Sequence, residues 1–208
     1  RPARLGQKKT PADYAEIRDF LLSNIETAGA AVLSIDTLLY GGLIPSRLHT
    51  LEEDEALERL MLLKTLREKN PSVKLYAFHC IMRCPTYSSD DEEPDYYADY
   101  GAEIHQLGRL THLEKLGMGD AQDCAAMREK IDADALADYL NRRAFNRRMN
   151  IRTLDLVEDG TTDFLIIPQD DSAKYGYTAM DQQAVRAVID EKVLNDRVIL
   201  YPGADELG

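Results

Sequence analysis

The stretch Phe-Leu-Ile-Ile-Pro-Gln-Asp-Asp-Ser, residues 164–172, decides the fold class of this 208-residue chain. Residues 164–168 are apolar and suit a short buried strand, and a polar cluster with two adjacent carboxylates follows at once. Three other strand-like runs lead into polar or charged clusters in the same way: residues 30–36, 73–82 and 198–202. Helical patterns separate these runs, and such an alternation is typical of a parallel α/β sheet.

The helical patterns are periodic recurrences of apolar residues, and most of them carry boundary signals. Helices are predicted over residues 11–25, 51–69, 95–116 and 178–194, and more than one helix over 120–158 with an interruption near Asp132. Thr10 and Thr178 are the predicted N-caps of the first and last of these helices. The apolar run 30–39 suits a strand that is covered on both faces.

The predicted fold class is therefore α/β, with a parallel sheet of at least four strands and covering helices. The sheet is either an open doubly wound sheet or part of a barrel. Residues 1–208 are expected to form a single α/β domain or fragment, with a helical insertion at residues 86–160. The chain begins at Arg1 and stops directly after a predicted strand, so we expect it to be a piece of a larger α/β protein.

Composition narrows the possible partners. The formal net charge of −12 argues against nonspecific nucleic-acid binding, which needs a concentrated basic surface. The longest apolar run, residues 28–35, is too short to span a bilayer, and no signal-peptide pattern is present, so we expect no membrane partner and a cytoplasmic location. The three cysteines do not form a disulfide or zinc pattern.

The pair Asp170-Asp171 is the sharpest local signal for chemistry. The carboxyl ends of parallel strands meet at one edge of a sheet, where ligands bind, so the polar clusters should assemble there. Adjacent side chains on an extended segment point in different directions, which would let one carboxylate orient a reacting group while the other donates a proton. Alternatively, the pair holds a divalent cation, or one aspartate caps a turn and the other is solvated. Asp205 and Glu206 repeat the arrangement after the last strand.

Asp36 ends an apolar run, where an unpaired charge would be costly, so we expect Arg47 or Arg83 to pair with it. Gly41 and Gly42 break the chain and could present Arg47 to an anionic or hydroxyl-rich ligand; a structural ion pair is the alternative role for either arginine. Tyrosines are frequent near these loops, and aromatic faces with hydroxyl tips suit sugars. Tyr175, close to the aspartate pair, is included in the expected binding residues for that reason.

Several common catalytic motifs are missing from the sequence. It contains no glycine-rich phosphate loop, no nucleophile elbow and no Cys-x-x-Cys pair, so a serine or cysteine nucleophile is poorly supported. The histidines do not form a convincing metal pair. We therefore predict no cofactor and assign no metal ligand, with a divalent cation on the carboxylates as the open alternative.

The motifs quoted above, together with Leu33-Ser34-Ile35-Asp36 and Gly203-Ala204-Asp205-Glu206, resemble the bacterial domain-of-unknown-function family DUF4127. The resemblance runs through most of the chain. It implies that these motif residues belong to one functional edge, and it carries no activity. Because members of that family are longer, it also agrees with the expectation of a fragment.

A looser resemblance concerns the aspartate pair alone. A strand that ends in Asp-Asp among aromatic residues is similar to the acidic pair of barrel glycosidases that use the acetamido group of the substrate as nucleophile. That likeness implies that Asp170 orients the acetamido group and that Asp171 protonates the leaving oxygen. A glycosidase with two separate carboxylates would instead pair Asp171 with Glu206.

The leading hypothesis is a carbohydrate-active hydrolase domain, glycosidase-like, that binds a small-molecule or carbohydrate ligand. Its predicted catalytic residues are Asp170, Asp171 and Glu206, and its predicted binding residues are Asp36, Gly41, Gly42, Arg47, Arg83, Tyr175 and Asp205. Two alternatives remain. One is a divalent-metal-dependent hydrolase that uses Asp36, Asp170, Asp171 and Asp205, and the other is a noncatalytic ligand-binding or interaction domain.

Overall fold

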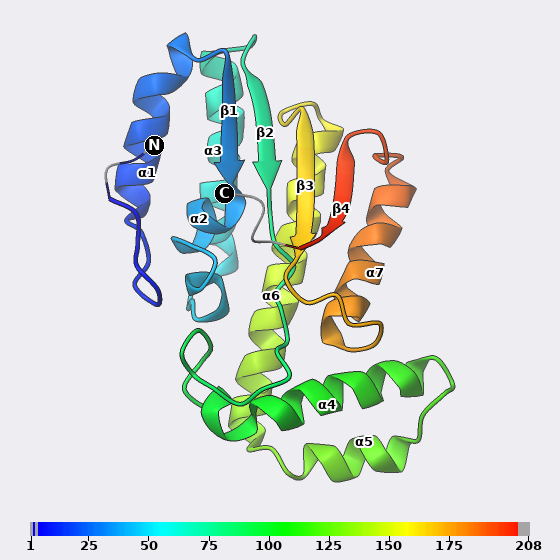
Figure 1. Ribbon diagram of the computed structural model, residues 1–208. Helices are drawn as coiled ribbons and strands as arrows, with labels where there is room; N and C mark the ends of the chain where they lie inside the picture. The colour runs from blue at the N-terminus through cyan, green and yellow to red at the C-terminus, as the bar shows by residue number, and fades with distance from the viewer. Residues whose placement is uncertain (1, 3, 204–208) are drawn as a thin grey trace.

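The computed structural model of the chain describes residue 2 and residues 4–203. Within this range it contains one four-stranded sheet whose strands are all parallel, which confirms the predicted fold class. The strands are β1 (Ala30–Ser34), β2 (Lys74–Phe78), β3 (Phe164–Gln169) and β4 (Val198–Pro202). They lie side by side in the order of the sequence, β1-β2-β3-β4 (Figure 1).

Helices connect the strands and flank the sheet. The α-helices are α1 (Tyr14–Asn24), α2 (Ile35–Tyr40), α3 (Glu53–Lys69), α4 (Tyr97–Lys115), α5 (Ala121–Arg128), α6 (Ala133–Glu158) and α7 (Tyr177–Glu191). Two short 3-10 helices, η1 (Ile25–Thr27) and η2 (Pro45–Arg47), complete the described elements. In Figure 1, α3 and α6 lie behind the sheet and α7 lies beside β4.

The one-way order of the strands leaves one face of the sheet without helices. Crossover connections between parallel strands are right-handed. When each new strand joins the same edge of the sheet, all the connecting helices therefore lie on the same face. Leu33, Leu75 and Ile167 point to the helix side and are buried. Val32 and Ile199 belong to the other face and are 72% and 47% exposed. A doubly wound sheet reverses its strand order and covers both faces, so these four strands follow the barrel-like alternative instead.

Two strands are shorter than the sequence predicts. The expected strand over residues 30–36 ends at Ser34, because the Ser34 hydroxyl caps a helix by accepting a hydrogen bond from the Thr37 N–H at 3.1 Å. Helix α2 then takes up the rest of the apolar run and ends at Gly41, whose φ of 85° is left-handed. In β2 the ladder ends at Phe78, while Ile81 still forms an isolated bridge with Gln169.

The predicted caps of the first and last helices were also wrong. Asp13, not Thr10, caps α1 by accepting hydrogen bonds from the Ala15 and Glu16 N–H groups. Helix α7 begins after Gly176, and Thr178 lies inside its first turn, where its side chain is buried. The expected interruption near Asp132 is confirmed, since this residue separates α5 from α6 and caps α6.

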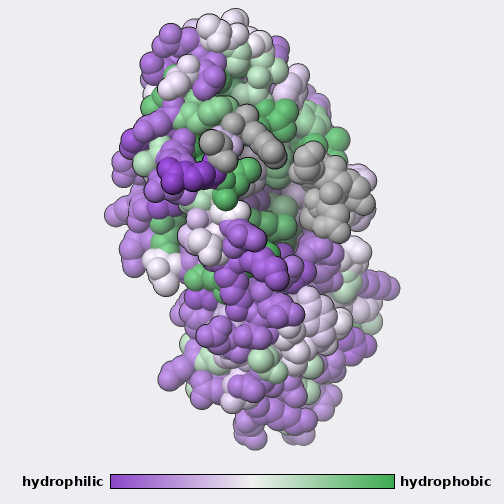
Figure 2. Space-filling model, turned by 60° about the vertical axis from the view of Figure 1, so that its left-hand side comes forward, coloured by the Kyte–Doolittle hydropathy of each residue, from purple (hydrophilic) through white to green (hydrophobic). Residues whose placement is uncertain are grey.

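The region 86–160, predicted as a helical insertion, contains α4, α5 and α6. Figure 1 shows α4 and α5 below the carboxyl ends of the strands, while the 26-residue α6 runs from there up behind the sheet. A second apolar cluster, separate from the main core, holds this part together through residues such as Tyr97, Ile104 and Tyr139. In Figure 2 the lower part is mainly hydrophilic on the face shown, and hydrophobic residues gather in the upper part. No helix among the described residues is long and apolar enough to cross a membrane.

A matched pair of substitutions tests the one-sided cover of the sheet. Ile167 on β3 is fully buried, whereas Ile199 on β4 is 47% exposed. Ile167→Ala should lower the free energy of unfolding by about 2–5 kcal/mol, because it leaves a cavity in the core. Ile199→Ala should lower it by less than about 1 kcal/mol. Urea unfolding measures both, and equal losses would show that the face bearing Ile199 is covered in solution.

Candidate functional site

Two arginines and three carboxylates form an ion-pair cluster at the carboxyl edge of the sheet. Glu93 Oε1 accepts hydrogen bonds from Arg83 Nε at 2.7 Å and from Arg47 Nη1 at 3.2 Å. Glu92 Oε2 accepts from the same two arginines, at 2.8 Å from Arg83 Nη2 and 3.2 Å from Arg47 Nη1. Asp170 Oδ2 lies 3.1 Å from Arg83 Nη1 and 3.6 Å from Arg47 Nη2. The structure thus brings together Arg47, Arg83 and Asp170, as the sequence predicted.

Each arginine reaches the cluster because the chain turns sharply beyond a regular element. Arg47 is the last residue of η2, which follows the two left-handed glycines Gly41 and Gly42. A side chain at Gly41 would collide with Pro11 and Ala12, so glycine permits the close approach of the N-terminal segment. Arg83 follows the bridge between Ile81 and Gln169, which carries the chain of β2 alongside that of β3.

Burial differs sharply between the members of the cluster. The side chains of Glu93 and Arg47 are 1% and 3% exposed, whereas those of Asp170 and Glu92 are 26% and 46% exposed. Burial raises the pKa of Glu93, and the charges of Arg47 and Arg83 oppose that rise. The buried carboxylate of Glu93 therefore holds the two guanidinium groups together. The carboxylates of Glu92 and Asp170 are more exposed to solvent.

Asp171 lies next to Asp170 but has different partners. Its Oδ1 accepts a hydrogen bond from the Ala173 N–H at 3.0 Å, and its Oδ2 accepts one from the Thr178 hydroxyl at 3.2 Å. Thr178 is in turn contacted by Arg143 Nη2 at 3.1 Å. The two adjacent aspartates are therefore held separately, one by guanidinium groups and the other by a hydroxyl and a backbone amide.

Asp36 does not pair with Arg47 or Arg83, contrary to the sequence-based expectation. It lies in the first turn of α2, is 2% exposed, and accepts a hydrogen bond from the Cys80 N–H at 2.9 Å. Burial raises its pKa to about 7, and the backbone hydrogen bond and Arg47 counteract part of that effect. Asp36 therefore fastens α2 to the segment after β2.

Of the remaining predicted site residues, some line the cavity beside the ion-pair cluster and others do not. Gly41 and Gly42 line the cavity in front of the cluster. Tyr175 packs against His112 of α4, with ring centroids 5.7 Å apart, and does not line this cavity. Asp205 and Glu206 lie outside the described residues, so the structure says nothing of their expected roles.

Two cavities meet at Arg83 and Asp170, which line both. The larger, of about 500 Å³, also has Lys8, Gly41, Gly42, Arg47 and Glu92 in its wall. The smaller, of about 370 Å³, also has Tyr87, Asp171 and the residues around them in its wall. Asp170 and Asp171 both line the smaller cavity, so one ligand there could contact both, and a longer ligand could also reach the larger cavity past Arg83 and Asp170.

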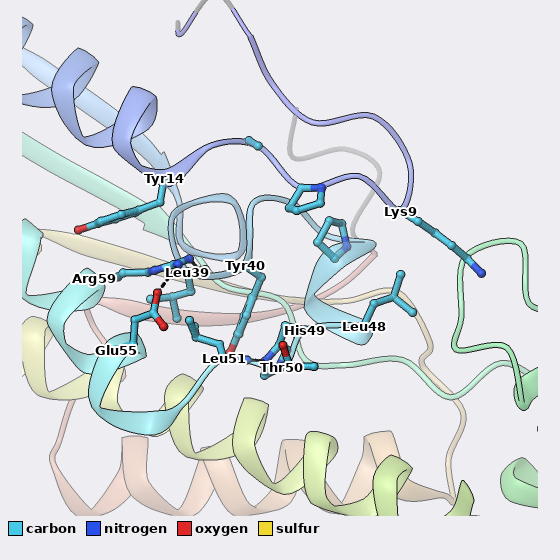
Figure 3. A pocket seen from close by; sticks show the side chains of 13 residues that line it. Lys9, Tyr14, Leu39, Tyr40, Leu48, His49, Thr50, Leu51, Glu55 and Arg59 are labelled. Carbon is cyan, nitrogen blue, oxygen red and sulfur yellow. Dashed lines mark hydrogen bonds and ion pairs between the residues drawn. The ribbon is translucent and has the colours of Figure 1, made fainter.

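A third cavity, of about 430 Å³, lies on the other side of Pro45, which also lines the larger cavity of the ion-pair cluster. Figure 3 shows Arg59 near Leu39 and Glu55, with Tyr14, Tyr40 and His49 among the surrounding side chains. The guanidinium of Arg59 is bound to the Leu39 carbonyl and to Glu55, and it lies 4.7 Å from the centre of the Tyr14 ring. Its charge is thus used to hold α3 against α1 and α2.

Of the residues proposed for a metal centre, Asp36, Asp170 and Asp171 are described by the structure, and Asp205 lies outside the described residues. Among residues 2 and 4–203, no group of three or more histidine, cysteine or acidic side chains could hold a metal ion. Asp36 is bound to the Cys80 N–H, and Asp170 is occupied by two arginines. The metal-dependent alternative stays a hypothesis, because Asp205 lies outside the described residues.

Three important residues of the site were missed in the sequence. Glu92 and Glu93 belong to the polar, acidic stretch 88–94, to which no role was assigned, and Thr178 was predicted to be a helix N-cap. One signal was available. The loop contains more acidic residues than there are basic residues near it, and Arg47 and Arg83 required acidic partners. Spacing along the chain could not show which acid is buried.

Substitution of the two glutamates separates their roles. Glu93→Gln should lower the free energy of unfolding by about 3–5 kcal/mol, because it leaves the buried Arg47 and the partly buried Arg83 short of a counter-charge. Glu92→Gln, at a side chain that is 46% exposed, should cost less than about 1 kcal/mol. Chemical unfolding of both variants measures the difference. A small cost for Glu93→Gln would mean that the arginines do not depend on it.

The raised pKa of Asp36 leads to a prediction about how stability depends on pH. Its pKa rises from 3.8 to about 7 on folding, so between those values the folded protein holds a proton that the unfolded chain has released. This contribution to stability is complete below about pH 4 and is lost as the pH rises through about 7. Asp36→Asn removes the titration, so its melting temperature should rise relative to the parent protein between pH 4 and pH 8. A constant difference across that range would contradict the assignment.

Comparison with known proteins places the chain in a family. No curated protein and no solved structure matches it. The likeness to acetamido-assisted glycosidases therefore stays an expectation. The family described as "Protein of unknown function (DUF4127)" matches residues 1–208, the whole chain, in agreement with the resemblance of its motifs. The chain belongs to the DUF4127 family.

Proposed function

We propose that this chain is a carbohydrate-active hydrolase domain that binds its ligand in the two cavities that share Arg83 and Asp170. The observation that carries the proposal is the alternation of guanidinium and carboxylate groups along their walls. Sugars present many hydroxyl groups, each of which can donate and accept a hydrogen bond, so they match a wall with both kinds of group.

An aromatic surface beside the charges supports the same ligand class. Tyr87 lines the smaller cavity, is 49% exposed, and its hydroxyl lies 3.1 Å from Arg83 Nη2. A half-exposed ring of this kind offers an apolar face to one side of a sugar ring, while its hydroxyl stays fixed to the cluster. Charged groups and an aromatic face are thus available to one ligand.

The different surroundings of the two aspartates suggest a division of labour in hydrolysis. Asp170, fixed by two guanidinium groups, is suited to orient the acetamido group of an amino-sugar substrate. Asp171 has a hydroxyl and a backbone amide as partners instead of guanidinium groups, and we assign it the role of giving a proton to the leaving oxygen. The acetamido oxygen would form a bond to the anomeric carbon as the glycosidic bond breaks, and water would then open the cyclic intermediate.

Asp171→Asn tests the proposal, because the amide keeps the shape of the side chain and cannot donate an acidic proton. With amino-sugar glycosides as substrates, kcat should fall by a factor of about 100 or more, while binding measured by calorimetry should change little. Asp123→Asn, on the exposed surface of α5, is the matched control and should behave like the parent protein.

The same experiment decides between hydrolysis and binding alone. Turnover that is undiminished in Asp171→Asn rejects the catalytic assignment. Binding without turnover by the parent protein across a broad glycoside panel favours the noncatalytic ligand-binding domain, and absence of both binding and turnover rejects the carbohydrate proposal as a whole.

A further inference from the structure

The hydroxyl of Thr178 lies between one donor and two acceptors. Arg143 Nη2 donates to Thr178 Oγ1 at 3.1 Å, and because a guanidinium nitrogen can only donate, the hydroxyl must direct its own proton elsewhere. Two acceptors are within reach: Asp171 Oδ2 at 3.2 Å and the Met82 carbonyl at 3.4 Å. The hydroxyl has a single proton, so it serves one of these acceptors at a time.

The charge of Asp171 decides which acceptor the hydroxyl serves. The Met82 carbonyl already accepts a hydrogen bond from Arg143 Nη2 at 2.7 Å, whereas an ionised carboxylate offers a charge-assisted bond, about twice as strong as a neutral one. The hydroxyl therefore points to Asp171 while that carboxyl is ionised. When the carboxyl takes up a proton, the hydroxyl can turn to the Met82 carbonyl, so neither state leaves this buried group without an acceptor.

Thr178 supports Asp171 from behind and does not reach the ligand. It is 2% exposed and lines neither of the two cavities that meet at Arg83 and Asp170, whereas Asp171 lines the smaller one. Thr178 belongs to the first turn of α7, and the arginine that donates to it belongs to α6. Two helices therefore fix the hydroxyl behind the loop that carries Asp171.

We infer that Thr178 is a positioning residue that lets Asp171 pass between its two protonation states during turnover. The inference rests on the proposed function, in which Asp171 gives its proton to the leaving oxygen. Asp171 must then regain a proton, which the water that opens the cyclic intermediate supplies, while Thr178 keeps its own proton throughout. The hydrogen bond from Thr178 strengthens as negative charge appears on Asp171, so it stabilises the carboxylate at the step in which the proton leaves.

Thr178→Val tests this inference, because valine keeps the shape of threonine and lacks the hydroxyl. With amino-sugar glycosides, kcat should fall by about tenfold to a hundredfold, while KM should change little because Thr178 lines neither cavity. The limb of the pH–rate profile on which activity is lost with rising pH should move to higher pH by about one unit, because the carboxylate has lost a donor. Thr178→Ser keeps the hydroxyl and should restore both the rate and the profile.

Two further variants complete the experiment. Thr162→Val is the matched control: Thr162 precedes β3, is fully buried, and its hydroxyl has no hydrogen-bond partner in the described part of the chain, so kcat and the pH profile should not change. Thr178→Ala removes the same hydroxyl with a smaller side chain in case valine disturbs the packing, and melting curves show which variants are folded. The titratable and charged groups around Asp171 stay the same in all these variants; they are Arg83, Cys84, Tyr87 and Asp170 in the wall of the smaller cavity, and Arg143 and Asp181 behind Thr178.

The outcomes separate this inference from the proposed function. A lower kcat with an unmoved pH profile means that Thr178 supports only the fold, and it overturns the inference. Undiminished turnover in Thr178→Val and Thr178→Ala also overturns it, and the proposed function survives either result if Asp171→Asn loses turnover. If the parent protein turns over no glycoside, the proposed function fails and the inference fails with it. A slower Thr178→Val with a shifted profile, together with recovery in Thr178→Ser, supports the inference directly.

Discussion

The carboxyl edge of this protein depends on one buried guanidinium group, that of Arg143 on α6. Its Nη2 donates to the Met82 carbonyl at 2.7 Å, and its Nη1 donates to the Arg83 carbonyl at 3.1 Å. Its Nε lies 2.7 Å from Asp181 of α7, as an ion pair rather than an aligned hydrogen bond. The Arg143 side chain therefore ties the segment that follows β2 to both α6 and α7. Arginine suits this position because its donors diverge in a rigid plane.

The position of the ion-pair cluster depends on this contact of Arg143. Arg83 leaves the sheet at a carbonyl that Arg143 holds, so its own side chain starts from a fixed point. Arg143 also contacts Thr178, which contacts Asp171, so the second aspartate is tied to the same group. The two adjacent aspartates thus belong to different networks that share a common support. This arrangement explains how neighbours in sequence can be held in separate surroundings.

Local patterns in the sequence were sufficient for the parallel sheet and for the gathering of charged residues at its edge. The helix break near Asp132 and the meeting of Arg47, Arg83 and Asp170 followed from periodicity and from the topology of parallel strands. The apolar run 30–39 was misread because helix and strand cannot be separated by hydrophobicity alone in so short a run. The partner of Asp36 was misread because a backbone N–H leaves no trace in the sequence.

The sequence could not show which charged side chains are buried, and the reason is a different one. Glu92 and Glu93 are adjacent in one acidic loop, yet their side chains are 46% and 1% exposed. What separates them is the position of two arginines that are 46 and 10 residues away from Glu93 along the chain. Glu93 takes the inner position and accepts hydrogen bonds from both arginines, and Glu92 and Asp170 line the larger cavity. The order of burial within the cluster, rather than its composition, therefore decides which of its carboxylates line the larger cavity.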